Sequence, residues 1–238
     1  MKEYEVYSSL KVPKNSKIII RLDGRSFHKL ASDLNLVKPY DDDFYRVFAK
    51  VCEDLFREFS PLFVYAFSDE ISLLFDNVPF EGRLEKLDSV IASFTSSSFV
   101  INYNVEFKKP PAFDARVIPI SDDDILKYFK WRQDESWRNC VNSHGIAYLK
   151  TKYSNTEAND KINGMNISDV HELLFENNIN LNDIETYKKR GIGVYRKNRK
   201  VEGFNKKENK NQTSYRSYVY TDWELPIFNK EFFDGVIK

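Results

Sequence analysis

Residues 16–24 of the chain read SKIIIRLDG, and this stretch decides the interpretation of the fold. Its apolar residues, three isoleucines and a leucine, form a short and largely β-branched run, which is typical of a buried strand. The Asp23-Gly24 pair that follows is a common turn dipeptide and ends the strand. The sequence therefore predicts a first strand with a carboxylate at its carboxyl end.

Two helices and three further strands are predicted around this strand. Apolar residues recur with the i, i+3, i+4 spacing of a helix over 44–59 and again over 84–101. Apolar runs over 62–67 and 71–75 indicate a tight hairpin of central strands, and residues 112–120 indicate another strand. The order strand, helix, strand, strand, helix, strand predicts an α+β fold of the split βαβ, ferredoxin-like kind, an antiparallel sheet with both helices on one face.

The C-terminal half predicts more helices and a β-ribbon. Ser121 and the three aspartates after it start a long helix, because they offer a cap and negative charge at the positive end of the helix dipole. Shorter helices are expected over 166–174 and up to the Lys-Arg-Gly sequence at 189–191. Residues 215–220 alternate in polarity and are predicted to pair with 192–195. We expect this half to pack on the sheet.

The composition is that of a packed globular protein. Of 238 residues, 42% are hydrophobic and 15% aromatic, which is enough apolar surface to offset the entropy of folding. Two cysteines cannot build a disulfide framework, the N-terminus has no apolar leader, and the uncharged stretch 89–105 is too polar to span a bilayer. We therefore expect a cytoplasmic protein without a membrane partner. The sequence contains no zinc-ligand spacing, P-loop or GxSxG motif.

The charges of the chain are unevenly distributed. Lysine plus arginine and aspartate plus glutamate number 36 each, so the formal net charge is zero. Residues 188–212 nevertheless hold ten cations against two acids, a local net charge of +8. Within them the stretch 197–210, with Lys197, Arg199 and Lys200, is either a flexible arm on a phosphate backbone or the solvated tip of a β-ribbon.

Two carboxylates are predicted to meet at one edge of the sheet. Asp23 ends the first strand, and Asp69 lies at the tip of the hairpin that this topology places beside it. Neighbouring carboxylates repel unless a cation lies between them, and oxygen ligands suit Mg²⁺, with Gly24 free to offer its carbonyl. Two Mg²⁺ ions there would serve a phosphoryl or nucleotidyl transfer. Both segments are also common turns, and Glu70 either orients the site or only solvates its turn.

Candidate phosphate-binding groups follow the first aspartate. The turn formed by Arg25, Ser26, Phe27 and His28 exposes backbone N–H groups that can cradle phosphates, and Lys38 can add a point charge. In the alternative interpretation, Phe27 fills the core while Arg25 and His28 face solvent.

Aromatic and cationic residues alternate on the long helix. Trp131-Arg132 and Trp137-Arg138 can stack bases and contact phosphates, although both tryptophans also suit core positions. We expect Arg132 and Arg138 to carry the functional part of this pattern.

Seven segments resemble the tRNA-His guanylyltransferase family in order and spacing: RLDGRSFH (21–28), KP (38–39), FSDE (67–70), FDAR (113–116), YFKWRQ (128–133), ELLF (172–175) and KRG (189–191). The similarity covers nearly the whole chain. It implies a nucleotidyltransferase with a palm-like core and two Mg²⁺ ions, which extends tRNA at its 5′ end, opposite to the direction of ordinary polymerases. In this family ATP or GTP activates the 5′ end, the 3′-hydroxyl of the incoming nucleotide attacks, and pyrophosphate is finally removed.

The resemblance also implies roles for individual residues. A palm-like catalytic core would span 1–120, and a tRNA-binding extension would span 121–238 and pack on it as one compact unit. The metal ligands would be Asp23, Gly24 and Asp69, with Glu70 in the catalytic set. The residues expected to bind the nucleotide are Gly24, Arg25, Ser26, Phe27, His28, Lys38 and Ser68. The residues expected to bind tRNA are Arg132, Arg138, Asn139, Lys197, Arg199 and Lys200.

One departure separates the chain from the eukaryotic members of the family. Those enzymes carry His-Ile-Asn-Asn shortly after Trp-Arg-Gln, whereas this chain reads WRNC over 137–140 and keeps only Asn139. It is therefore more similar to the archaeal and bacterial branch, which repairs 5′-truncated tRNAs by adding nucleotides templated by Watson-Crick pairing. By the same resemblance we expect a homo-oligomer, a dimer or, more specifically, a homotetramer.

Three other interpretations remain open. A dedicated tRNA-His guanylyltransferase would add a single G at position −1. A palm-domain nucleotide or dinucleotide cyclase would use the same carboxylates and triphosphate turn, without needing the basic stretch at 188–212. A non-catalytic tRNA-binding module would keep the basic half and use the carboxylates only for structure.

Overall fold

The sheet of the protein is built around β1 (Lys17–Gly24), which pairs with β4 on one side and β3 on the other. The computed structural model describes residues 1–205 and 210–237. Within them the sheet has six strands in the order β4-β1-β3-β2-β5-β6, and every neighbouring pair is antiparallel. The other strands are β2 (Phe63–Phe67), β3 (Glu70–Phe75), β4 (Phe113–Ile120), β5 (Ile192–Asn205) and β6 (Lys210–Asp222). The order of the first four confirms the predicted split βαβ fold.

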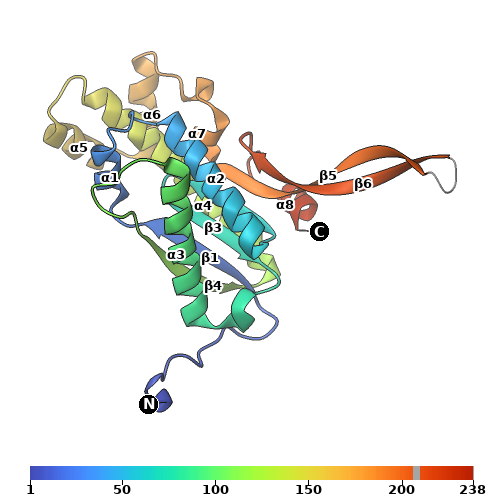
Figure 1. The fold of residues 1–238 in the computed structure, drawn as a ribbon. Helices are drawn as coiled ribbons and strands as arrows, with labels where there is room; N and C mark the ends of the chain where they lie inside the picture. The colour runs from blue at the N-terminus through green and yellow to red at the C-terminus, as the bar shows by residue number, and fades with distance from the viewer. Residues whose placement is uncertain (206–209, 238) are drawn as a thin grey trace.

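Two long helices cover one face of this sheet, as predicted. α2 (Asp42–Phe59) and α3 (Leu84–Tyr103) lie side by side across it (Figure 1). α2 begins at Asp41, whose side chain accepts the Phe44 N–H, and its apolar stripe faces the sheet because the stripe repeats with the helical period. Ile18, Ile20 and Leu22 of β1 point into the same buried layer.

The opposite face is covered by the C-terminal half. α4 (Asp122–Leu149) and α8 (Lys230–Val236) enclose a second apolar layer with Phe63, Tyr65 and Phe129 at its centre. Gln133 of α4 ties the last segment of the chain to this layer, because its amide donates to the Pro226 oxygen and accepts the Phe228 N–H. The two halves of the chain therefore share this second apolar layer. No helix in the described part of the chain is long and apolar enough to cross a membrane.

A smaller group of helices surrounds the end of α4. It comprises α1 (Phe27–Asp33), α5 (Asn155–Asn163), α6 (Ile167–Glu176) and α7 (Thr186–Arg190), with the 3-10 turns η1 (Lys2–Tyr4), η2 (Pro79–Gly82) and η3 (Leu181–Asp183) elsewhere along the chain. α5 was missed in the sequence analysis, although Ser154 and Glu157 form a capping box at its start. α6 starts with a similar box, at Asn166 and Asp169.

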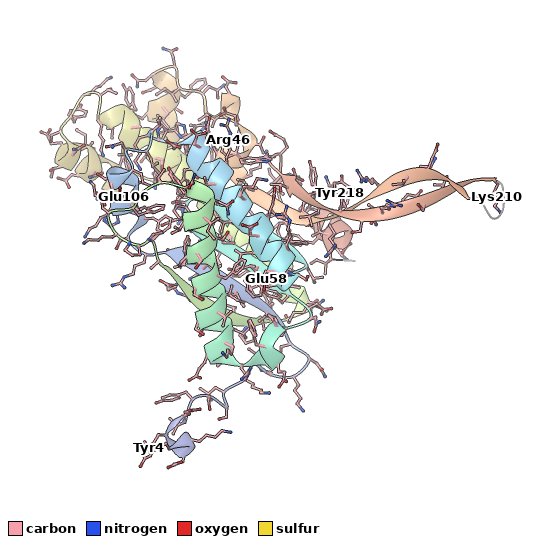
Figure 2. The ribbon with its side chains drawn as sticks, viewed as in Figure 1. Tyr4, Arg46, Glu58, Glu106, Lys210 and Tyr218 are labelled. Carbon is pink, nitrogen blue, oxygen red and sulfur yellow. The ribbon has the colours of Figure 1, made fainter. Side chains whose placement is uncertain are left out.

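β5 and β6 continue beyond the sheet as a two-stranded ribbon that projects away from the core (Figure 1). Figure 2 shows Tyr218 partway along the ribbon and Lys210 near its far end. The predicted pairing of the two strands is confirmed, but its register differs, since 215–220 pair with 195–200 rather than with 192–195. The lysines at 206 and 207 of the predicted arm lie outside the described residues.

Gly191, between α7 and β5, occupies a position that only glycine fits. Its φ is +76°, and an added Cβ would lie 2.5 Å from the backbone oxygen of Ala66. We predict that Gly191→Ala lowers the free energy of unfolding by at least about 1 kcal/mol, because strained backbone and overlap add together. Urea titration measures this change. In the control Gly235→Ala, where no atom lies within 4 Å of the added Cβ, stability should rise by no more than about 1 kcal/mol.

Candidate active site

Asp23 and Asp69 lie at the same end of the sheet, as the topology predicts. In the β1–β3 ladder Asp23 stands opposite Glu70, and the Gly24 N–H donates a hydrogen bond of 3.0 Å to the backbone oxygen of Asp69. Burial raises the pKa of the Asp69 carboxyl above its ordinary value, and the charge of Asp23 raises it further. The two carboxylates are therefore close enough for their charges to interact.

The donor set at this edge fits a hard divalent cation. Asp23 and Asp69 offer carboxylate oxygens that repel each other, and a cation beside them would relieve that repulsion. Glycine is required at Gly24, since an added Cβ would lie 2.4 Å from the Phe27 ring. The described residues contain no group of three or more His, Cys, Asp or Glu side chains that could hold a metal. A cation here would thus rely on two carboxylates, backbone oxygen and water, a set that suits Mg²⁺.

The turn after Asp23 has one side chain in the core and others at the surface. Phe27 is buried and packs on Phe113 at a ring distance of 4.9 Å, while the side chains of Arg25 and His28 are exposed, as the alternative interpretation had it. The Arg25 N–H donates to the Ala112 oxygen at 2.8 Å, so this amide is not available to a phosphate. Any contact of the Phe27 residue with a nucleotide must come from its backbone.

A cavity of about 400 Å³ opens beside Asp69. This volume lies in the range of sites for small molecules of nucleotide size. Residues from several elements that the sequence analysis singled out line it together: Gly24, Ser26, Phe27, His28, Lys38, Ser68, Asp69 and Asn139. Lys38 brings a cationic group and His28 an imidazole to the wall that also contains Asp69. Asn139, predicted to bind tRNA, lies on the cavity side of α4.

Part of the cavity wall was missed in the sequence analysis. The missed residues include Tyr40, Tyr45, Ser136, Ser143 and Lys188. Ser136, Asn139 and Ser143 follow one another at helical spacing, and this polar stripe of α4 is the signal that could have identified them. Lys188 is held in place by Asp42, whose Oδ1 lies 3.0 Å from its Nζ.

Glu70 and Arg132 form a buried ion pair behind the carboxylates. Arg132 donates to both Glu70 oxygens, from Nε at 2.8 Å and from a terminal nitrogen at 2.7 Å. Its guanidinium lies between the rings of Phe67 and Trp131, at 5.3 and 4.3 Å from their centroids. Arg132 is only 7% exposed, so the structure removes it from the candidate tRNA contacts and gives it a supporting place beside the site. Glu70 is itself only 8% exposed, so it does more than solvate its turn.

The other predicted tRNA-binding cations lie on the surface. Arg138 is exposed on α4 and pairs with Glu135 at 3.1 Å. Lys197 lies on the ribbon with its Nζ 3.5 Å from the centroid of the Tyr220 ring, and Arg199 lies over Tyr218 at 5.8 Å. These cations are separated from the carboxylate pair along the chain and come from two different elements, α4 and the β5–β6 ribbon.

Comparison with known proteins gives concordant results. The family model described as tRNAHis guanylyltransferase (Thg1) matches residues 1–121. The probable tRNA(His) guanylyltransferase of Dictyostelium discoideum is 32% identical over 214 residues, which cover 82% of each chain. A bacterial Thg1-like protein solved in complex with ATP has a TM-score of 0.77 and 29% identity, covering 99% of this chain and 95% of its own. A bacterial Thg1-like protein solved in complex with GTP has a TM-score of 0.71 and 29% identity, and the match covers 95% of this chain and 91% of that protein.

Breaking the buried ion pair should destabilise the protein. We predict that Arg132→Met lowers the free energy of unfolding by about 3 to 5 kcal/mol, because it leaves the Glu70 carboxylate buried without a partner. Adding Glu70→Gln should recover much of this loss, since no unpaired charge then remains.

Denaturant titration of the single and double variants measures both effects. Arg57→Met is the matched control, because the Arg57 side chain pairs with Glu53 and Asp54 but is 58% exposed. This substitution should change the free energy of unfolding by about 1 kcal/mol or less. A loss for Arg132→Met as small as the control would show that the pair does not form.

Proposed function

The chain belongs to the tRNA(His) guanylyltransferase family, and on this premise we propose that it is a metal-dependent, template-directed 3′-to-5′ nucleotidyltransferase that repairs 5′-truncated tRNA. The observation that carries the proposal is the Asp23–Asp69 pair, of which Asp69 lines a nucleotide-sized cavity with Lys38 and His28 in its wall. The similar bacterial proteins bind ATP and GTP, which supports nucleoside triphosphates as substrates here.

The proposed reaction has three phosphoryl transfers. The 5′-phosphate of the RNA attacks the α-phosphate of ATP or GTP and releases pyrophosphate. The 3′-hydroxyl of the incoming nucleotide then attacks the activated 5′-phosphate and expels the nucleoside monophosphate. Water finally removes pyrophosphate from the new 5′-triphosphate. Each step needs alignment and charge neutralisation more than a strong general base.

The residues of the chain have distinct parts in this scheme. Asp23, Asp69 and the Gly24 carbonyl would hold Mg²⁺, which when bound neutralises phosphate charge and aligns the reacting oxygens. Ser26, His28 and Lys38 would bind the triphosphate from the cavity wall. The apolar and hydroxyl-bearing side of the cavity, with Tyr40, Tyr45 and Ser136, would receive the base. Glu70 would keep the hairpin tip in place through its bond to Arg132.

The preference for repair over addition of one G rests on the replaced WRNC segment. Asn139 lines the cavity and is kept, but the other residues of the eukaryotic His-Ile-Asn-Asn segment are absent. The similarity to a bacterial Thg1-like protein over 99% of the chain supports the same choice. A dedicated tRNA-His guanylyltransferase remains the second candidate, because the curated relatives of this chain carry that name.

We further propose that residues 1–120 act as the catalytic core and 121–238 as its RNA-binding extension. Within the extension Arg138, Lys197, Arg199 and Lys200 would contact the tRNA backbone. The proposed assembly is a homo-oligomer, and the proposed location is the cytoplasm, where tRNA and nucleoside triphosphates are available.

Primer extension at the 5′ end tests the activity. We expect a 5′-monophosphorylated tRNA lacking its first nucleotide, incubated with ATP, all four NTPs and Mg²⁺, to grow until its acceptor stem is fully paired. The Asp23→Ala and Asp69→Ala variants should each reduce the rate by about 10³-fold or more, because each loses several kcal/mol of charge stabilisation. Length on a sequencing gel and tRNA binding by filter retention are the measurements.

The outcomes separate the candidates. Addition of one G to full-length tRNA-His alone would support the dedicated enzyme, and no growth on either RNA would favour a cyclase or a binding module. The exposed Asp160→Ala on α5 is the matched control and should leave the rate unchanged. Normal turnover in either Asp23→Ala or Asp69→Ala would remove the two-carboxylate centre.

The ribbon should contribute to tRNA affinity through salt-sensitive contacts. We predict that the triple variant Lys197→Gln, Arg199→Gln, Lys200→Gln binds tRNA more weakly. The slope of log K against log salt should become shallower by about 0.7 to 0.9 for each phosphate that the variant no longer neutralises. Titrations at several salt concentrations measure this slope. A triple Arg46→Gln, Lys50→Gln, Arg57→Gln on α2 removes the same charge, and an equal effect there would show that only net charge matters.

A further inference from the structure

The face of the sheet under α4 is left open at β4, the neighbour of β1. Side chains alternate along a strand, so Arg21 and Asp23 lie on the same face as Ile19, whose side chain belongs to the α4 layer. Register places Arg116 and Asp114 of β4 beside them on that face. Arg116 and Asp114 are 56% and 59% exposed in their side chains, so α4 does not cover this part of the sheet.

Like charges face each other in two successive rows there. Arg21 stands opposite Arg116, and Asp23 stands opposite Asp114. Such pairs across neighbouring strands are destabilising unless a counter-charge lies between them. In the carboxylate row, Asp23 is also a ligand of the proposed cation. The arginine row, roughly 7 Å further along the strands, is the corresponding place for an anion.

Arg21 is also short of a partner. Its Nε is buried without a hydrogen bond among the described residues, and the nearby Glu70 Oε2 lies 4.0 Å away. Glu70 is already occupied by the bidentate contact of Arg132. Arg116 has only a loose contact with Asp114, at 3.8 Å. Two guanidinium groups are thus available to one anion.

A rigid aromatic ring borders the arginine row. Trp131 is 49% exposed although one side of its indole lies over the Arg132 guanidinium at 4.3 Å. Arg132 is held by the buried Glu70 carboxylate, and the edge of Tyr128 supports the same ring at 5.9 Å. The Arg21 guanidinium lies 5.8 Å from the Trp131 ring. An exposed, preorganised indole beside cations is the arrangement that stacks a nucleic-acid base.

The two acids connect this open face with the nucleotide cavity. Asp69 lines the cavity, whereas Asp23 points to the open face with Arg21. A nucleotidyl transfer needs two substrates at one centre, and the cavity accounts for only one of them. Resting on the function proposed above, we propose that Trp131, Arg21 and Arg116 bind the 5′-terminal nucleotide of the RNA acceptor, with its base on the indole and a phosphate between the two guanidinium groups.

Binding and kinetics with a defined RNA test this subsite. The probe is a 5′-monophosphorylated acceptor-stem hairpin that lacks its first nucleotide. We expect Trp131→Ala to raise its Kd and its KM by about 5- to 150-fold, the range for one stacked base, with no change in the Kd of ATP. Trp131→Phe keeps a ring and should retain most of the affinity. Arg116→Gln should make the salt dependence shallower by about 0.7 to 0.9.

Intrinsic fluorescence gives a readout that requires no turnover. The chain has three tryptophans, and RNA binding should quench the emission of Trp131, so the quench should disappear in Trp131→Phe. The matched controls are Phe175→Ala, another exposed aromatic residue, and Arg46→Gln, a cation that Figure 2 shows on α2. Both should bind the hairpin like the wild type.

The outcomes distinguish this proposal from the proposed function. If the wild type extends RNA but Trp131→Ala and Arg116→Gln bind it normally, the subsite is wrong and the activity stands. If ATP alone quenches Trp131 and RNA does not, the face binds free nucleotide and the subsite is overturned. If RNA quenches Trp131 but is not extended, the subsite is supported and the proposed activity fails.

Discussion

The β1–β3 ladder sets the position of every charged group in the site. Its register holds Asp23 opposite Glu70, and the Gly24 N–H continues the pairing to the Asp69 backbone beyond the strand end. A slip of one residue would turn Arg21 and Asp23 into the apolar layer beneath α2 and α3, because neighbouring side chains point to opposite faces. The buried run at 16–24 therefore does more than form a core strand, since its alternation selects the face on which chemistry can occur.

The buried Glu70–Arg132 pair transmits this placement to α4. Replacing a buried ion pair by apolar residues is often neutral for stability, so its presence here requires an explanation based on position. Arg132 holds the first residue of β3, next to Asp69, and presents its other side to Trp131. One guanidinium thus connects the hairpin tip, the long helix and the open face. Loss of the pair would disturb the carboxylate centre and the aromatic surface together.

The sequence predicted those parts of the structure that follow from apolar patterning and topology. The strands at 62–67, 71–75 and 112–120 and the helix at 44–59 were found, because their buried faces consist of apolar residues. The meeting of Asp23 and Asp69 followed from the strand order alone. Predicting these features does not depend on knowing which polar groups become buried.

α4 shows why the rest could not be predicted. Its buried stripe includes Arg132, Gln133 and Ser136, so apolar periodicity does not reveal which side of the helix is covered. An arginine on such a stripe is indistinguishable in sequence from a solvated cation, and the difference depends on Glu70, 62 positions earlier. The place of Trp131 was left open for the converse reason, since a tryptophan suits both a core and a surface position until its neighbours in space are known.

The like charges that face each other on the open face link folding to ligand binding. Asp23 opposite Asp114 and Arg21 opposite Arg116 each weaken the β1–β4 ladder in the free chain, because like charges in register repel. A cation bound at Asp23 and a phosphate at the arginine row would supply further counter-charge, and ligands that bind only the folded state stabilise it. The neutral net charge of the whole chain conceals this arrangement, because acids and bases that are balanced in number are separated in space. The proposed cation and the RNA phosphate would thus each add a counter-charge at the place where RNA and metal would meet.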